Sequence, residues 1–79
     1  MDTYPIKGVC PNQLQIEVNG GTVGKVKFTG GCSGNSQGLA ALINGMSVKE
    51  AIARLKGIKC GGRPTSCPDQ LAKVLENYI

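Results

Sequence analysis

Residues 13–28 read QLQIEVNGGTVGKVKF, and this stretch decides the fold class. In its first half apolar and polar residues alternate, as in a strand with one face toward a core; the apolar residues are Leu14, Ile16 and Val18. Residues 19–21, Asn-Gly-Gly, supply the positive φ angles of a tight hairpin turn. The chain therefore returns as a second strand over 22–28, with Val26 and Phe28 in the core.

The length of the hairpin loop determines which residues face each other across the two strands. With a three-residue loop, Val26 falls opposite Leu14 and Gly24 falls opposite Ile16. A two-residue loop instead requires a bulge near Gly24 to keep the apolar side chains on one face. Both arrangements leave the two lysines of the return strand on the solvent face.

After the hairpin the chain changes to helical periodicity, and three helices are expected. The first spans about 36–44, before Gly45, and its apolar positions are Leu39, Leu42 and Ile43. The second begins with a capping box formed by Ser47 and Glu50, and its apolar positions are Val48, Ile52 and Leu55. The third begins at Pro68 as its first helical position, followed by Asp69, Leu71, Val74, Leu75 and Tyr78.

These elements define an α+β fold: a small antiparallel sheet of two or three strands followed by three helices packed on one face. The third strand would come from residues 4–9, where Pro5 favours an edge position. The chain has 79 residues and no internal repeat or linker, so residues 1–79 are expected to form a single domain. A chain of this size buries only about 60% of its surface on folding, so a cross-link would help to stabilise it.

The chain contains four cysteines and no histidine; the cysteines are Cys10, Cys32, Cys60 and Cys67. Each lies in a predicted connection, next to glycine or proline. No export signal and no apolar run of about 20 residues is present, so the expected location is the cytoplasm, with no membrane association. Disulfides are disfavoured there, whereas four thiolates suit tetrahedral Zn²⁺. The sequence therefore favours a shared zinc ion, with an iron–sulfur cluster as the alternative.

Other interpretations of the cysteines remain open at this point. They can be buried small hydrophobic residues, they can form two disulfides, or they can act as redox thiols. Spacing does not decide between these possibilities, because the closest pair, Cys60 and Cys67, is separated by six residues. In the redox alternative these two residues form the pair, since Cys67 is predicted at the N-cap of the third helix, where unpaired amides favour a thiolate.

A glycine-rich loop at residues 30–35, GGCSGN, precedes the first predicted helix. Backbone amides at a helix N-terminus can bind phosphate or another anion, including that of a nucleotide. The candidate contacts are Gly31, Ser33, Gly34 and Asn35. The loop matches neither a Walker loop nor a dinucleotide fingerprint, and a glycine-rich turn without a ligand is the alternative.

The sequence contains no candidate catalytic residue for acid–base chemistry. Of the five acidic residues, Glu50 and Asp69 have capping roles and Glu17 lies on a polar strand face, and no histidine can serve as a base. The net charge of +4 is spread along the chain. Without a basic helix or a stacking platform of aromatic residues, little favours nucleic-acid binding.

Residues 65–69 spell TSCPD, and together with residues 30–35 and the order of the four cysteines they resemble the TSCPD domain family. Members of this family occur as small stand-alone chains, and related domains lie at the C-terminus of cobalamin-dependent ribonucleotide reductases. The resemblance implies that the four cysteines are the family's cysteines and the metal ligands. It also implies an accessory role in nucleotide metabolism and DNA synthesis, with a ribonucleotide reductase or another protein of nucleotide metabolism as partner.

The resemblance to ribonucleoside-diphosphate reductase does not by itself imply that this chain is an enzyme. That reaction needs a large barrel holding a radical cysteine, a redox pair and a nucleotide, and 79 residues are too few to build it. A thiol redox partner of the reductase is the alternative role. The chain is also similar, more distantly, to the U-type scaffold proteins of iron–sulfur cluster assembly, through its small sheet, its glycine-flanked Cys32 and residues 46–51.

Overall fold

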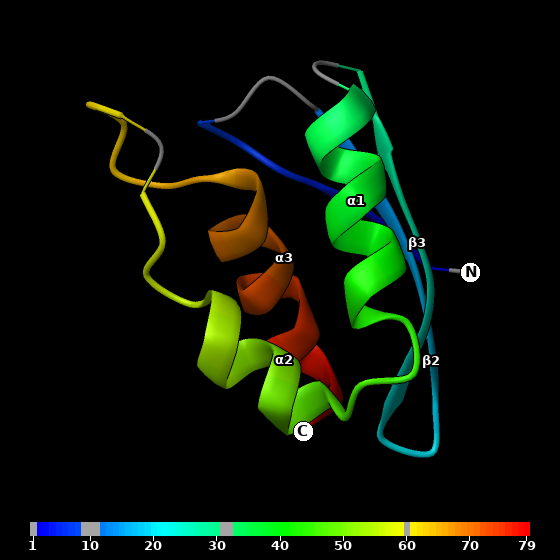
Figure 1. Cartoon of the computed structure of the whole chain (residues 1–79). Helices are drawn as coiled ribbons and strands as arrows, with labels where there is room; N and C mark the ends of the chain where they lie inside the picture. The colour runs from blue at the N-terminus through cyan, green and yellow to red at the C-terminus, as the bar shows by residue number, and fades with distance from the viewer. Residues whose placement is uncertain (1, 9–11, 31–32, 60) are drawn as a thin grey trace.

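The computed structural model describes residues 2–8, 12–30, 33–59 and 61–79. Within these residues the chain forms a three-stranded antiparallel sheet followed by three α-helices and a final 3₁₀ turn (Figure 1). Their bounds are β1 (Asp2–Pro5), β2 (Gln13–Asn19), β3 (Thr22–Thr29), α1 (Ser33–Ile43), α2 (Val48–Leu55), α3 (Cys67–Leu75) and η1 (Glu76–Tyr78). The predicted α+β fold class is confirmed.

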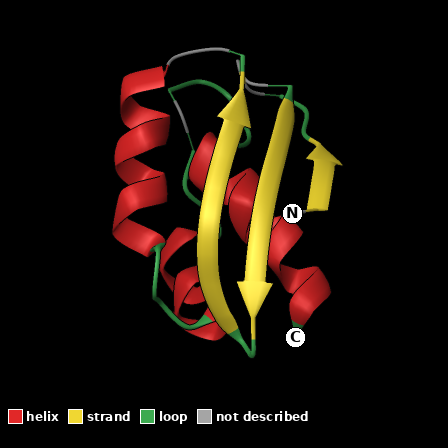
Figure 2. Ribbon diagram, turned by 90° about the vertical axis from the view of Figure 1, so that its right-hand side faces the viewer, coloured by secondary structure: helices red, strands yellow, loops and turns green. Residues whose placement is uncertain are grey.

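The sheet has the order β1-β2-β3, and the helices cover only one of its faces (Figure 2). Helix α1 packs against β3, and α2 packs against α3. The core between these layers is aliphatic; its buried members are Ile6, Leu14, Ile16, Val23, Ile43, Val48, Ala51, Leu55, Leu71, Ala72, Val74 and Leu75. Burial of these apolar side chains is the main favourable contribution to folding.

The hairpin between β2 and β3 has a two-residue turn. Gly20 and Gly21 both have positive φ, +56° and +79°, which is the type I′ geometry that matches the twist of the strands. Ile16 lies opposite Val26, whereas Val18 lies opposite Val23, so β3 has one extra residue between these two pairs. The predicted bulge near Gly24 is confirmed, and the pairing expected for a three-residue loop is wrong.

Helix α1 differs most from its prediction. It begins at Ser33, three residues earlier than expected, so residues 33–35 belong to its first turn and not to a loop. Ile43 is buried, whereas Leu42, another of the apolar positions at helical spacing, is 78% exposed. Since α1 packs against β3 along one side only, the apolar residues of its other side lie in solvent.

Helix α2 begins as predicted, with Ser47 as its N-cap. The Ser47 hydroxyl accepts a hydrogen bond from the Glu50 amide at 3.1 Å, which satisfies an amide at the start of the helix. The Glu50 carboxylate contacts the Arg54 guanidinium at 2.7 Å on the exposed surface, one helical turn further on. The hydroxyl half of the predicted capping box is therefore confirmed, and the carboxylate is engaged by Arg54.

The two ends of the described chain meet beside the sheet. The Tyr4 and Tyr78 hydroxyls are 2.7 Å apart, and their rings pack edge to face with centroids 6.2 Å apart. The Tyr78 hydroxyl also donates to the Asp2 carboxylate at 2.5 Å. Burial, and then these hydrogen bonds, raise the pKa of Tyr78 above its usual value. These contacts join β1 to the turn η1 that follows α3.

Candidate metal site and its polar network

Helix α3 begins one residue earlier than the sequence predicts. Its N-cap is Ser66, whose hydroxyl accepts a hydrogen bond from the Asp69 amide at 3.1 Å. Cys67 is therefore the first helical residue and not the N-cap, and Pro68 is the second. A serine hydroxyl is a much better acceptor for a helix amide than a thiol, which explains why Ser66 takes the cap.

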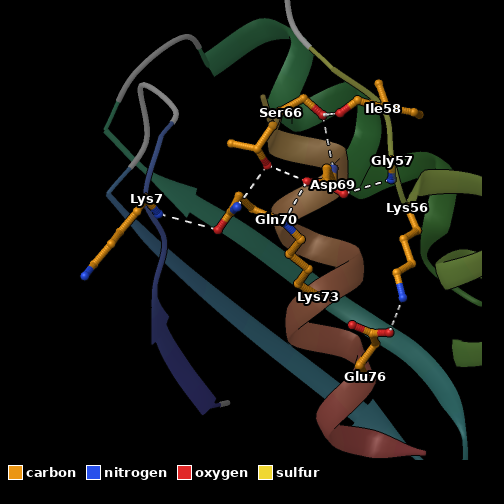
Figure 3. A network of polar contacts seen from close by, with 10 residues as sticks. Lys7, Lys56, Gly57, Ile58, Ser66, Asp69, Gln70, Lys73 and Glu76 are labelled. Atoms are coloured by element: carbon orange, nitrogen blue, oxygen red, sulfur yellow. Dashed lines mark hydrogen bonds and ion pairs between the residues drawn. The ribbon is translucent and has the colours of Figure 1, made fainter. Parts of the chain in front are cut away.

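Asp69 is at the centre of the polar contacts at this helix start (Figure 3). Its side chain is almost fully buried. One carboxylate oxygen accepts from the Gly57 amide at 2.8 Å, while the other accepts from the Thr65 hydroxyl at 2.5 Å and lies 3.1 Å from the Lys73 ammonium. Gly57, Thr65 and Lys73 thus meet at one carboxylate, which has two neutral hydrogen-bond donors and one ammonium group as partners.

These contacts favour the ionised form of Asp69. The Thr65 hydroxyl has the largest effect, followed by the Gly57 amide, and Lys73 adds a smaller contribution. Together they lower the pKa of Asp69 to about 2, against the opposing effect of burial. Asp69 is therefore an anion throughout the physiological range and serves as a fixed acceptor, not as a proton-transfer group.

Ser66 and Asp69 close the loop between α2 and α3. The Ser66 hydroxyl donates to the Ile58 carbonyl at 2.6 Å, and Asp69 accepts from Gly57 next to it. Figure 3 shows both bonds side by side at the end of the loop. The two ends of the loop of residues 59–65 are therefore held next to each other, and the sequence of this loop includes Cys60.

A second set of contacts ties the N-terminal segment to the same helix. Gln70 donates to the Thr65 hydroxyl at 2.9 Å and accepts from the Lys7 amide at 3.5 Å. Gly8, with φ of +79°, packs so closely on Thr65 that a Cβ there would lie 2.8 Å from its methyl group. A side chain at this position would be strained by the backbone conformation and would have to displace the Thr65 methyl group, which favours glycine.

The segment after Cys10 is fixed to the end of the sheet. The Asn12 amide donates to the Thr29 carbonyl at 3.0 Å, and the Asn12 carbonyl accepts from the Ile6 amide at 3.2 Å. Gly30 lies beside Asn12, because a Cβ on Gly30 would be 3.7 Å from the Asn12 side-chain oxygen. The described residues on both sides of Cys10 and before Cys32 are therefore neighbours.

Of the four predicted ligands, Cys67 is the one that the structure describes, half-buried in the first turn of α3. Cys10, Cys32 and Cys60 lie outside the described residues. Each is two positions from a residue with a contact given above; these residues are Gly8, Asn12, Gly30 and Ile58. Among the described ranges, no three cysteine or acidic side chains come together as a metal-binding group.

The predicted anion-binding residues fall partly within the described chain. Ser33, Gly34 and Asn35 lie in the first turn of α1, and Gly31 lies outside the described residues. These three residues therefore belong to the helix and not to a loop before it, and the anion site itself stays a prediction.

Sequence reasoning missed the network that surrounds Cys67. It gave Asp69 only a capping role at the helix start and gave no structural role to Thr65, Ser66 or Gln70. One signal was available: Ser66 and Asp69 have the same three-residue spacing as Ser47 and Glu50, and this spacing marks an N-cap. The partners Gly57 and Ile58 carry no such signal, because their role depends on tertiary contacts.

The fold and the motif agree with a comparison against known protein families. The model of the TSCPD domain family matches residues 2–79, so the chain belongs to the TSCPD domain family. Neither the curated proteins nor the solved structures give a match to the chain. Within the described part of the chain, no helix is both long and apolar enough to cross a membrane.

Proposed function

We propose that this chain is a metal-binding TSCPD domain in which four thiolates hold one Zn²⁺ ion. The ligands are Cys10, Cys32, Cys60 and Cys67. The observation that carries the proposal is the meeting of the segments that flank these cysteines. Gly8 packs on Thr65, Gly30 lies beside Asn12, and Ile58 is bonded to Ser66.

The length of the intervening chain limits how far each cysteine can be from these contacts. Two residues of extended chain span at most about 7 Å. Every proposed ligand is within two positions of one of the contacting residues, which supports a common site for the four sulfur atoms. In Figure 1 the end of β3, the start of α1 and the segment leading into α3 lie in the same half of the molecule.

The charges around this end also suit the proposal. Four thiolates and one Zn²⁺ ion carry a net charge of −2, which requires nearby cations or amides. Lys7, Lys59 and Arg63 are exposed residues of the two loop segments that contain Cys10 and Cys60. The first turn of α3 also provides a positive helix end next to Cys67, which favours the thiolate form of a cysteine.

The metal would act here as a cross-link between distant parts of the chain. The aliphatic core is small, and Asp69 already joins the loop to α3 by polar contacts. Four metal bonds would join the segment before β2, the segment before α1, the loop before α3 and the first turn of α3 itself. For a domain of this size, such a metal contributes directly to the free energy of folding.

The measurement that tests this function is the metal content of the purified native protein by elemental analysis. We expect one zinc per chain, lost in each of four single Cys→Ser variants and unchanged in a Ser47→Ala control. If anaerobic preparations instead contain iron with acid-labile sulfide, the four cysteines hold an iron–sulfur cluster and not zinc. Four thiols that titrate freely in a metal-free protein, with an unchanged thermal midpoint after chelation, would refute the metal site.

We further propose that the domain works in the cytoplasm as an accessory to deoxyribonucleotide synthesis, with a ribonucleotide reductase or a related protein as partner. Its family membership supports this role. The reducing cytoplasm also keeps thiols available as metal ligands. Binding of the zinc-loaded domain to a cobalamin-dependent reductase that lacks its own C-terminal domain can be measured by sedimentation. A binding constant weaker than millimolar would contradict the proposed partner.

A further inference from the structure

The outer side of β3, away from β2, already pairs with an extended segment of this chain at one end. The Val23 amide donates to the Met46 carbonyl at 2.8 Å, and the Val23 carbonyl accepts from the Gly45 amide at 2.8 Å. Thr22 and Ser47 form an antiparallel bridge beside them. The linker between α1 and α2 therefore acts as a very short added strand at the start of β3.

The alternation of hydrogen bonds in an antiparallel ladder shows which residues of β3 direct their backbone groups to this outer side. In such a ladder, every second residue directs its amide and carbonyl to the same neighbour. Val23 directs them outward, and the extra residue opposite Glu17 restores the same phase at Val26 and Phe28. No backbone hydrogen bond between described residues reaches the outer side of Val26 or Phe28.

The side chains along this edge define what an added strand must offer. Lys25 and Lys27 are exposed on the sheet face opposite the helices, and no ion pair within the described chain includes either. Val26 and Phe28 point to the helix side and are only half-buried. In Figure 2, α1 lies on the side of β3 that has no neighbouring strand, so an added strand would also lie next to α1.

We propose that the β3 edge binds an extended acidic segment of a partner protein as a fourth strand. Its acidic side chains would lie beside Lys25 and Lys27, and its apolar side chains would cover Val26 and Phe28. A second copy of this chain fits less well. In a two-fold pairing of β3 with itself, the lysines of the two copies would lie next to one another, and like charges in this position are destabilising.

A synthetic peptide in which valine and glutamate alternate over seven residues tests the proposal by its effect on amide chemical shifts. We expect the largest shifts at Val26 and Phe28, and at least tenfold tighter binding than for the same peptide with lysine in place of glutamate. The double variant Lys25→Glu, Lys27→Glu should reverse this preference. These positions are exposed, so the variant keeps the fold.

Two N-methylated forms of the acidic peptide separate strand addition from charge attraction alone. Methylation of the valine amides removes the hydrogen bonds on one side of the peptide, and methylation of the glutamate amides removes those on the other. Strand pairing predicts that one form binds and the other does not. Equal binding of both forms, largest shifts in β1, or a dimer in sedimentation that protects the Val26 amide would overturn the proposal.

Discussion

Helices α2 and α3 begin with the same local device but use it differently. In both, a serine hydroxyl accepts a hydrogen bond at 3.1 Å from the amide three residues later, Ser47 from Glu50 and Ser66 from Asp69. The acidic residue at that third position then differs. Glu50 is exposed and pairs with Arg54 of its own helix, whereas buried Asp69 joins Gly57, from another part of the chain.

The same capping pattern can therefore stabilise one helix end alone, or can also join that helix to a distant segment of the chain. At α2 the cap and the ion pair stabilise one helix end in solvent. At α3 the serine also donates to Ile58, so cap and carboxylate together fix the loop that carries Cys60. The start of α3 is thus the structural support of the proposed metal site, and the start of α2 is its natural control.

The largest expected difference in stability between the two helix starts comes from removing the charges of Asp69 and Glu50. Asp69→Asn should lower the free energy of unfolding by about 3 kcal/mol, because the Gly57 amide, the Thr65 hydroxyl and Lys73 lose a buried anionic acceptor. Glu50→Gln should cost less than about 0.5 kcal/mol, since its pair is exposed. Urea unfolding of both variants measures this. Equal losses would refute the contrast.

Acid pH should reduce the advantage of the native protein over Asp69→Asn. The pKa of Asp69 is lowered from 3.8 to about 2, so its contribution is present above pH 4 and is lost as the pH falls toward 2. The difference in unfolding free energy between the two proteins should therefore shrink by about 2 kcal/mol from pH 6 to pH 2. A difference that stays constant over this range would show that Asp69 is not stabilised as an anion.

Removing the two capping hydroxyls sharpens the comparison. Ser47→Ala loses one hydrogen bond and should cost about 1 kcal/mol. Ser66→Ala loses the cap and also leaves the Ile58 carbonyl without this donor, so it should cost about 2 kcal/mol. In the metal-loaded protein, Ser66→Ala should also release zinc faster to a chelator. If the two variants have the same stability and the same release rate, Ser66 is only a helix cap.

The contact between the chain ends gives a reference outside both helix starts. Tyr78→Phe removes the hydroxyl that bonds Tyr4 and Asp2 and should cost about 1 kcal/mol. Since the pKa of Tyr78 is raised, its contribution is present below about pH 10 and falls as the pH rises further. Thermal unfolding between pH 8 and pH 11 should show this decline in the native protein and less of it in the variant.

The parts of the fold with local signals could be predicted from the sequence. Alternation in residues 13–18 and the glycines at 20 and 21 predict the hairpin, and Ser47 predicts the start of α2. The start of α1 was not predictable in this way, because residues 33–36 are polar or glycine and have no apolar period. Leu42 has helical spacing but lies on a side of α1 that the other described elements leave largely exposed.

For the candidate site, the sequence indicates only the proposed ligands. Four cysteines in a chain without histidine indicate thiolate chemistry, but the residues that support the site act over long distances. Asp69 bonds to Gly57, twelve residues away, and Gln70 bonds to Lys7. Neither contact follows from spacing or from helix propensity, because each depends on how α2, α3 and the N-terminal segment pack together.

X-ray absorption at the zinc edge of the native protein tests the central claim most directly. The proposed site predicts four sulfur ligands at about 2.3 Å, because all four ligands are thiolates. Cys67→Ser should abolish zinc binding, whereas Glu50→Gln should leave the spectrum unchanged. A first shell of nitrogen or oxygen atoms in the native protein, or a spectrum that does not change with Cys67→Ser, would contradict a four-cysteine site supported by the start of α3.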